Sequence, residues 1–442
     1  MTGLAKMVGV GFAVFLCLSV GHMQAYAAEQ DSVAAGAVNM EDKPLVAAIS
    51  EVFGDGEHLS AVILAYDKPI LGSSVSSDDF QVTDRLIENA YVSQLPEKGN
   101  KGEAAGKYIM LELEPLPLVE QGVEAHSAKD RAEREEKGFH GPTLGSHGNP
   151  QPLVPVRAEV RQKGLVKAED GTLYPPIEKL SSSHTCQLLI ENFVQDTFED
   201  EQQGKAKLMY NLYIPENIDS QKNYPLVVFM HDAGTVSPEI KATLSQGRGA
   251  VVWASKEWQE KHPCFVLAPQ YDTVIVDDNY QYGPELDRTI HLIEYLANKY
   301  PIDRNRIYNT GQSMGGMTAI AMDVKYPDFF AASYLVACKW DAKVTAPLGS
   351  QQIWAVAAEG DPGAAPSMQE ILGNLEQDGH KVLRMTAALE QGEDCINKAA
   401  AALVQPDCHL YYTLYTGGSH RSTWQHAYDL WPAMEWIFKQ KK

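Results

Sequence analysis

Residues 306–324 read RIYNTGQSMGGMTAIAMDV, and this stretch decides the fold. An apolar, strand-like segment runs into GQSMG at 311–315, a G-x-S-x-G pattern, and helix-compatible residues follow at 317–324. The pattern is typical of a serine on a tight strand-to-helix turn, where the hydroxyl is exposed and glycines let neighbouring backbone pass close by. Because five-residue patterns recur by chance, the motif alone is weak evidence. The strand-like and helix-like segments that flank it supply the structural context that the prediction needs. We therefore predict that Ser313 is a nucleophile; the alternative is an exposed serine in a glycine-rich turn.

Strand-like and helix-like segments alternate on both sides of this stretch, through residues 184–442. Strand character marks KLMYNLYIP (207–215), YPLVVFM (224–230), CFVLAPQY (264–271), ASYLVAC (332–338), QQIWAVAAEG (351–360) and HLYYTLYTGG (409–418). Helix character marks AVVWASKEWQEKH (250–262), the stripe of Leu286, Ile290, Ile293 and Leu296, and a closing helix striped by Ala427, Trp431, Met434 and Phe438. This alternation implies a mostly parallel sheet covered by helices on both faces.

The front of the chain has a different pattern. Short segments rich in β-branched and aromatic residues, such as LSAVILAY (59–66) and KYIMLELEPL (107–116), are separated by Gly, Asp, Ser and Lys clusters. This pattern predicts a small all-β sandwich over residues 45–181, with a long exposed loop at 121–150. The 442 residues suggest two domains. Residues 184–442 then form the second, an α/β domain.

The first 27 residues have the features of a signal peptide. Lys6 supplies a positive start, residues 7–20 are apolar or small, and Ala25-Tyr26-Ala27 is a small-x-small cleavage site. The apolar run is short for a membrane span. We expect a flexible lead at 28–44 after cleavage, a secreted or periplasmic location and no stable membrane insertion.

Charge and cysteine content limit the partners and cofactors. Removal of the signal peptide would take away Lys6 and leave the net charge one unit more negative than −21, which disfavours nucleic acid and anionic lipid. Five cysteines would remain, an odd number, and Cys395 with Cys408 is the pairing that their closeness in the sequence favours. No cysteine or histidine spacing suggests a metal, so we expect neither metal nor cofactor.

A serine nucleophile needs an acid and a base, and each should follow a strand. Asp361 comes directly after the strand-like segment at 351–360, with Glu359 and Asp341 as competitors, and a turn aspartate is the structural alternative. His420 follows the last strand-like segment in a glycine-rich loop. The other late histidines, His409 before that strand and His426 in the next helix, are poorer candidates. The chain order Ser, Asp, His favours a triad.

The developing oxyanion needs N–H donors. Met314 directly follows the nucleophile, and Ala233 or Gly234 in the loop after residues 224–230 would supply the second N–H. One such donor is typically worth about 3 kcal/mol of transition-state stabilisation. We expect His231 to brace this loop rather than to act as a base.

Several of these segments resemble a known enzyme family. YNLYIPE (210–216), VLAPQ (266–270), YPIDRNRIYNTGQSMGGMTA (300–319) and GGSHRSTW (417–424) resemble segments of α/β-hydrolase esterases of the feruloyl-esterase and polyhydroxybutyrate-depolymerase type, a group often placed with prolyl-oligopeptidase-like hydrolases. GEHLSAVILAYDKPI (56–70) is similar to an immunoglobulin-like domain that precedes the catalytic domain in one esterase subfamily. The resemblance implies an α/β-hydrolase fold behind an immunoglobulin-like sandwich.

Carried over residue by residue, the resemblance makes Ser313 the nucleophile, Asp361 the acid and His420 the base. Trp424 matches an aromatic residue that usually follows the histidine, so it is a candidate for substrate binding. The family usually has His-Gly where this chain has His231-Asp232. The aspartate adds bulk and negative charge beside the oxyanion loop, which puts the strength of the oxyanion hole in question.

We therefore predict a secreted serine esterase that hydrolyses short acyl or aromatic esters through an acyl-enzyme. Two alternatives stay open. A serine peptidase is disfavoured because the large propeller that usually restricts such enzymes is missing, and a non-catalytic binding or adhesion protein is supported only by Asp232. The expected partner is a small-molecule ester. Trp340 is a further candidate for lining the cleft, and the alternative is that it is a core residue. The sequence also leaves open a homo-oligomer.

Overall fold

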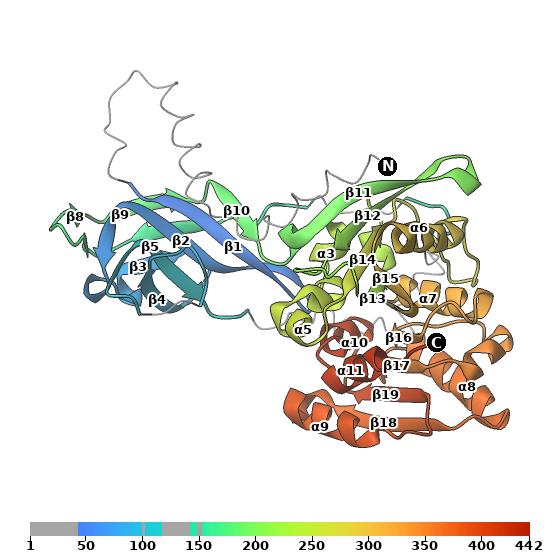
Figure 1. Ribbon diagram of the computed structural model, residues 1–442. Coiled ribbons are helices and arrows are strands. Elements are labelled where there is room, and N and C mark those ends of the chain that lie inside the picture. Colours follow the sequence, from blue (N-terminus) through green and yellow to red (C-terminus); the bar gives the residue numbers. More distant parts are fainter. Residues whose placement is uncertain (1–42, 100–101, 117–141, 148–152) are drawn as a thin grey trace, which may run out of the picture. The chain divides into compact units, whose positions relative to one another are not determined.

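The computed structural model describes residues 43–99, 102–116, 142–147 and 153–442 (Figure 1). The predicted signal peptide, all but the last two residues of the lead, and most of the loop predicted at 121–150 lie outside the described residues. Contacts divide the chain into two compact units, one built mainly from residues up to Asn192 and the other mainly from Phe193–Lys442. Each unit has its own hydrophobic core.

The first unit is built from strands, as its residue pattern predicts. Its larger sheet, within the described residues, has the order β10-β1-β2-β5-β4. The strands of this sheet are β1 (Leu45–Phe53), β2 (Gly56–Leu71), β4 (Ile87–Ser93), β5 (Ala105–Leu113) and β10 (His184–Gln187). Smaller sheets are formed by β3 (Phe80–Val82), β6 (Glu159–Gln162) and β9 (Ile177–Ser181), and by β7 (Val166–Lys167) with β8 (Leu173–Tyr174). Alternate residues such as Val62, Leu64 and Val160 fill the core between the layers.

The second unit has a single mixed sheet in its described residues, with the order β11-β12-β14-β13-β15-β16-β17-β19-β18. Its strands are β11 (Phe193–Asp200), β12 (Ala206–Tyr213), β13 (Tyr224–Met230), β14 (Phe265–Gln270), β15 (Ile302–Gln312), β16 (Ala332–Val336), β17 (Ile353–Ala358), β18 (Val382–Ala388) and β19 (Leu410–Thr416). Strands β11, β12 and β14 pair antiparallel, and all other pairs are parallel. The carboxyl ends of the parallel strands therefore meet at one edge.

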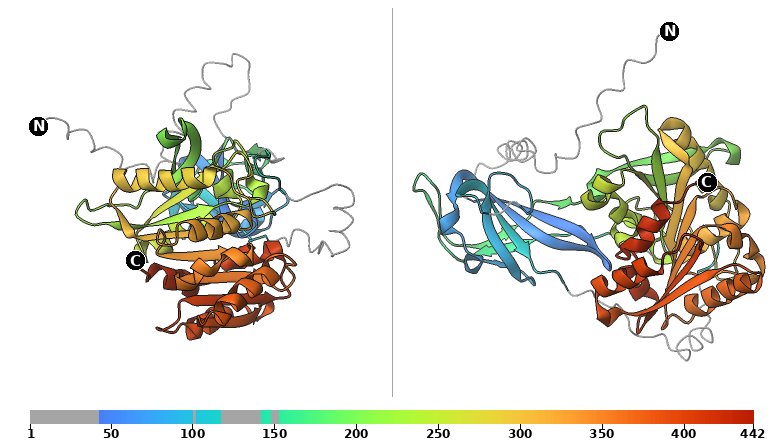
Figure 2. Two further views of the ribbon diagram at one scale, coloured as in Figure 1. Left: turned by 90° about the vertical axis from the view of Figure 1, so that its right-hand side faces the viewer. Right: turned by 60° about the horizontal axis from the view of Figure 1, so that its bottom comes forward.

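Helices cover both faces of this sheet (Figures 1 and 2). They are α3 (Ala242–Ser245), α4 (Arg248–Val251), α5 (Lys256–Lys261), α6 (Glu285–Lys299), α7 (Met314–Lys325), α8 (Ala364–Gln377), α9 (Glu393–Leu403), α10 (His420–Ala427) and α11 (Trp431–Phe438). Aliphatic residues of α6, α7 and α8 pack against one face, and the predicted stripe of α6 is fully or almost fully buried. Aromatic contacts fill the other face, including Tyr308 with Phe438 and Trp354 with Trp436. The predicted α/β architecture is confirmed.

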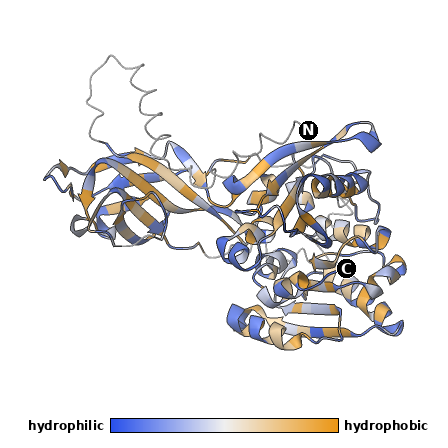
Figure 3. Cartoon of the chain, in the orientation of Figure 1, coloured by the Kyte–Doolittle hydropathy of each residue, from blue (hydrophilic) through white to orange (hydrophobic). Residues whose placement is uncertain are grey.

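The hydropathy of the central strands reflects their burial. Every residue of β14, β16 and β17 is buried, and Figure 3 shows apolar residues along the strands of this sheet and polar residues on many outer helix surfaces. In the part of the chain that the structure describes, none of the helices combines the length and the apolar character that a membrane crossing requires.

Three local predictions are wrong. The helix predicted over 250–262 is interrupted, because Ser255 leaves the helical conformation and caps α5. The closing stripe belongs to two helices, α10 and α11, with Pro432 in the first turn of α11. Cys395 and Cys408 are not paired: Cys395 is exposed on α9, whereas the buried Cys408 thiol donates to the carbonyl of Leu410.

Candidate active site

Ser313 is the single residue between β15 and α7. Its φ of 55° and ψ of −119° lie where non-glycine residues are rarely found, a conformation that is costly unless the surroundings hold it. They do so here, because the Ser313 N–H donates to the carbonyl of Val336 on the neighbouring strand β16 at 3.0 Å. The serine predicted from the motif therefore lies on a sharp strand-to-helix turn.

The two motif glycines are required by close packing around this turn. A Cβ atom on Gly315 would lie 1.9 Å from the carbonyl oxygen of Met230, at the end of β13. A Cβ atom on Gly311 would lie 2.5 Å from the carbonyl carbon of Gly315. Both distances are far below any van der Waals contact, so α7 can start this close to the sheet only with glycine at both positions.

His420 reaches Ser313 from the far end of the unit's sequence. It is the first residue of α10, whose start is fixed by a capping box between Ser419 and Ser422 after the Gly417-Gly418 turn. Its Nε2 lies 2.9 Å from Ser313 Oγ, a hydrogen-bonding distance. Because Nδ1 faces a carboxylate, the proton belongs on Nδ1 and Nε2 is free to accept from the serine.

Asp361 is that carboxylate. It lies in the turn after β17, is 3% exposed, and places Oδ2 at 2.5 Å from His420 Nδ1. Its Oδ1 accepts from the N–H groups of Gly363 and Ala364, both at 3.0 Å. Burial would raise the pKa of Asp361, but the hydrogen bonds from His420 and from the two N–H groups hold that pKa below its usual value. Asp361 is therefore ionised at neutral pH.

The competing side chains take other places. The Asp341 carboxylate accepts from the Lys343 N–H and caps a short turn, and Glu359 is exposed. His409 has its Nε2 on the carbonyl of Gly349 at 2.7 Å, and the ring of His426 packs against Tyr415. Of the candidates that the sequence offered, Ser313, Asp361 and His420 are the ones joined by hydrogen bonds.

His231 braces the loop after β13. It is completely buried, and its Nε2 accepts from the Tyr271 N–H at 3.0 Å, so Nδ1 carries the proton and donates to the carbonyl of Asp232 at 2.7 Å. Burial lowers the pKa of His231 and keeps the ring neutral. The ring therefore fixes the peptide group that joins Asp232 to Ala233.

Asp232 turns its side chain back onto its own loop. Its Oδ1 accepts from the Gly234 N–H at 2.7 Å and its Oδ2 from the Thr235 hydroxyl at 3.0 Å. The Gly234 N–H is thus already occupied, whereas the hydrogen bonds of the described residues leave the N–H groups of Ala233 and Met314 without an acceptor. Of the two loop donors predicted, Ala233 is the one available.

The two tryptophans differ in position. The Trp424 ring lies edge-on to His420, with centroids 5.0 Å apart, and lines a pocket of about 130 Å³ that Asp232, Gln312 and Arg421 also line. Trp340 is 4% exposed, belongs to the core and packs against Tyr280. Trp424 therefore lines a pocket, whereas Trp340 occupies a core position.

The sequence also matches known families. A family model named Esterase matches residues 205–430, about half of the chain, including Ser313, Asp361 and His420. The chain belongs to the Esterase family. An esterase Ig-like N-terminal domain matches residues 45–175 of this esterase. No protein of curated function matches it at a significant level.

One solved structure agrees with this assignment. A structure described as a thermostable esterase aligns with a TM-score of 0.71 and 26% sequence identity, covering 90% of this esterase and 100% of that chain. A feruloyl esterase module from Clostridium thermocellum has a TM-score of 0.37 and 14% identity over 66% of this chain and 94% of its own. An S-formylglutathione hydrolase from Staphylococcus aureus has a TM-score of 0.38 and 12% identity, over 56% and 96%. The latter two likenesses are too low to support an inference. The family and the first structure identify the esterase as a carboxylic ester hydrolase.

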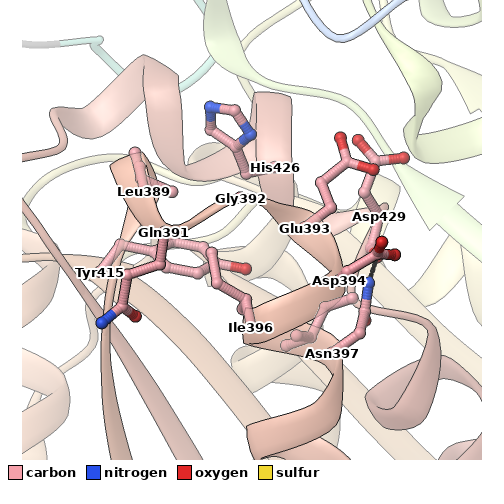
Figure 4. A pocket seen from close by; sticks show the side chains of 11 residues that line it. Leu389, Gln391, Gly392, Glu393, Asp394, Ile396, Asn397, Tyr415, His426 and Asp429 are labelled. Carbon is pink, nitrogen blue, oxygen red and sulfur yellow. Dashed lines mark hydrogen bonds between the residues drawn. The ribbon is translucent and has the colours of Figure 1, made fainter.

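A second pocket, of about 630 Å³, includes His426. Like the 130 Å³ pocket at Trp424, it is lined by none of the three hydrogen-bonded residues. Figure 4 shows Glu393, Asp394 and Asp429 on one side of it and Leu389 on the other. Asp429 is paired with Arg248, and its backbone carbonyl accepts from Asn397. Among the residues that the structure describes, no group of three or more His, Cys, Asp or Glu side chains is arranged to hold a metal ion.

Proposed function

We propose that the esterase is a serine hydrolase in which Ser313 is the nucleophile, His420 the general base and Asp361 the residue that orients the imidazole. The observation that carries the proposal is the continuous hydrogen-bonded chain from Ser313 Oγ through His420 to Asp361. Its three members come from the carboxyl-end turns of β15, β17 and β19, which are distant in sequence. The strained backbone at Ser313 adds support, because such strain is concentrated at functional sites.

In the proposed mechanism, Ser313 Oγ attacks the ester carbonyl as His420 Nε2 takes the hydroxyl proton. The resulting oxyanion accepts from the N–H groups of Met314 and Ala233, each typically worth about 3 kcal/mol to the transition state. When the tetrahedral intermediate collapses, the alkoxy group leaves with the proton from His420 and an acyl-Ser313 ester remains. Water, deprotonated by His420, then attacks that ester. As the second tetrahedral intermediate collapses, His420 returns the proton to Ser313 Oγ, and the acid is released.

The substrate class that we propose is a short acyl or aromatic carboxylic ester. The small pocket lined by Trp424, whose ring packs against His420, supports it, since its volume of about 130 Å³ suits a compact group and Trp424 offers an aromatic wall. We also propose that the esterase is secreted or periplasmic, on the basis of the signal-peptide pattern at 1–27. Amino-terminal sequencing of the exported protein should find Ala28 first; an intact amino terminus would contradict this.

The test is hydrolysis of short-chain aryl esters by the purified protein and by Ser313→Ala. We expect turnover by the wild type and loss of it in a folded Ser313→Ala variant. A substrate panel that varies acyl length and includes phenolic-acid esters and a peptide amide then shows which type of bond is cleaved and which acyl groups are accepted. Undiminished turnover in Ser313→Ala would refute the proposal, and faster cleavage of the amide would indicate a peptidase instead.

A further inference from the structure

We propose that Asp232 is a positioning residue that makes Ala233, and not Gly234, the second donor of the oxyanion hole. This inference rests on the proposed serine mechanism and gives a purpose to the residue that replaces the glycine usual in similar esterases. It follows from three features of the loop after β13: its own turn, its peptide orientation and its connection to the nucleophile.

The turn is closed by the aspartate. Asp232 caps a single 3-10 turn at Ala233–Thr235, with its carboxylate on the Gly234 N–H and on the Thr235 hydroxyl. A backbone hydrogen bond from the Thr235 N–H to the Asp232 carbonyl at 3.2 Å completes the turn. An N–H donor that is already bonded to a carboxylate is not available to an oxyanion, so Gly234 is removed from that role.

The orientation of the next peptide group follows from the same loop. His231 Nδ1 holds the Asp232 carbonyl at 2.7 Å, and in a planar trans peptide the following N–H points the opposite way from that carbonyl. The Ala233 N–H is therefore directed away from the buried His231 ring. His231 fixes the direction of this donor, and the Asp232 side chain keeps the residues after it from rotating.

The loop is also connected to the nucleophile. The Thr235 hydroxyl lies 3.0 Å from Gln246 Oε1 as well as 3.0 Å from Asp232 Oδ2, so these two acceptors share its one proton. Gln246 Oε1 also accepts from Gln312 Nε2 at 3.1 Å, and Gln312 Nε2 lies 3.5 Å from Asp232 Oδ2. Gln312 is the residue directly before Ser313. The two oxyanion donors, Ala233 on the loop and Met314 after the nucleophile, are thus held by one network, as precise positioning of a site requires.

Alanine and asparagine at position 232 separate positioning from charge. Asp232→Ala removes the acceptor for the Gly234 N–H. Asp232→Asn keeps it, because the amide oxygen can accept there while the Thr235 hydroxyl, which can both donate and accept, adapts to the amide nitrogen. We expect kcat for an aryl ester to fall roughly 10- to 100-fold in Asp232→Ala with KM within about threefold, and to stay within about threefold of wild type in Asp232→Asn.

Asp219→Ala is the matched control. Asp219 closes the same kind of turn, accepting from the Gln221 N–H at 2.9 Å and, through its carbonyl, from the Lys222 N–H at 3.0 Å. Asp219 precedes β13, whereas the site follows the carboxyl ends of the strands, so Asp219 lies at the opposite edge of the sheet. Asp219→Ala should therefore retain wild-type kcat. The affinity of an aryl boronic acid, which forms a tetrahedral adduct on the serine, should fall in Asp232→Ala in parallel with kcat.

The outcomes are distinct. Wild-type kcat and boronic acid affinity in a folded Asp232→Ala variant would overturn the inference and leave the serine mechanism intact, and so would an Asp232→Asn variant as slow as Asp232→Ala. A wild type that is inactive and that no serine-directed reagent labels would overturn both the inference about Asp232 and the serine mechanism. If Asp232→Ala does not fold, Thr235→Val decides: it removes the hydroxyl that joins Asp232 to Gln246, and kcat should fall roughly 3- to 10-fold at unchanged KM. Unchanged kcat in that variant would equally reject the proposal.

Discussion

The carbonyl oxygen of Met230 lies 1.9 Å from the position that a Cβ atom on Gly315 would occupy. This relationship joins the end of β13, where the proposed oxyanion loop begins, to the first turn of α7, which starts at Met314 directly after the proposed nucleophile Ser313. A side chain at residue 315 would push these two elements apart. The glycine is thus a condition for the geometry of the site as well as for local packing.

Gly315→Ala should therefore inactivate and destabilise the esterase. We expect loss of most activity on an aryl ester and a lower melting temperature, because backbone atoms rather than a flexible side chain stand in the way. Gly373→Ala is the control: apart from its chain neighbours and the nearby backbone of its own helix, no atom lies within 4 Å of the added Cβ, and alanine in the interior of α8 should stabilise by about 0.5–1 kcal/mol. Wild-type activity in Gly315→Ala would contradict the packing at the nucleophile turn.

Asp361→Asn tests how His420 is oriented. The amide can turn its NH2 group toward Nδ1 and thereby favour the tautomer whose Nε2 cannot accept the serine proton, so kcat should fall roughly 10³- to 10⁴-fold with little change in KM. Circular dichroism should show a retained fold. A variant that keeps a tenth or more of the wild-type kcat would mean that Asp361 does not hold the imidazole in its working form.

The pH dependence of stability should be affected by Asp323, in α7. Its Oδ1 accepts from Asn309 and Ser333, both at 3.0 Å, but complete burial raises its pKa to about 7. Because the folded-state pKa lies above the unfolded value, the folded protein binds more protons between about pH 4 and 7, and stability falls as pH rises through that window. Across the whole window the difference in the free energy of unfolding is on the order of 4 kcal/mol.

Urea unfolding of the wild type and Asp323→Asn at pH 5 and pH 8 measures this effect. The variant keeps a carbonyl oxygen for Asn309 and Ser333 but has no charge to bury, so it should lose less stability between these pH values than the wild type. The lowered pKa of buried His231 makes stability rise with pH. This contribution is the same in the wild type and the variant, so it cancels in the comparison. Equal losses in both would show that Asp323 does not titrate in this range.

The sequence was sufficient for the features that local patterns carry. The G-x-S-x-G segment with its flanking strand and helix placed Ser313, and the apolar stripe of Leu286, Ile290, Ile293 and Leu296 predicted the buried face of α6. The alternation of strands and helices predicted the sheet with helices on both faces. The first two follow from residue spacing within one segment, and the third follows from the order of such segments along the chain.

Other features depend on turns and tertiary contacts that no local pattern encodes. Which of Asp361, Glu359 and Asp341 meets the imidazole is decided by the turn after β17, where the N–H groups of Gly363 and Ala364 hold one carboxylate. The network through Gln246 was missed, because a glutamine 14 residues after Asp232 carries no signal of its own. The occupied Gly234 N–H likewise became visible only with the loop conformation.

The most direct test of the account is covalent labelling with a fluorophosphonate probe, followed by peptide mass spectrometry. We predict that the folded wild type takes up one probe on the peptide that contains Ser313, and that Ser313→Ala and His420→Ala take up none or label far more slowly. Failure of an active wild type to label at Ser313, or labelling of Ser313→Ala at the wild-type rate on another residue, would contradict the assignment of this serine as the nucleophile.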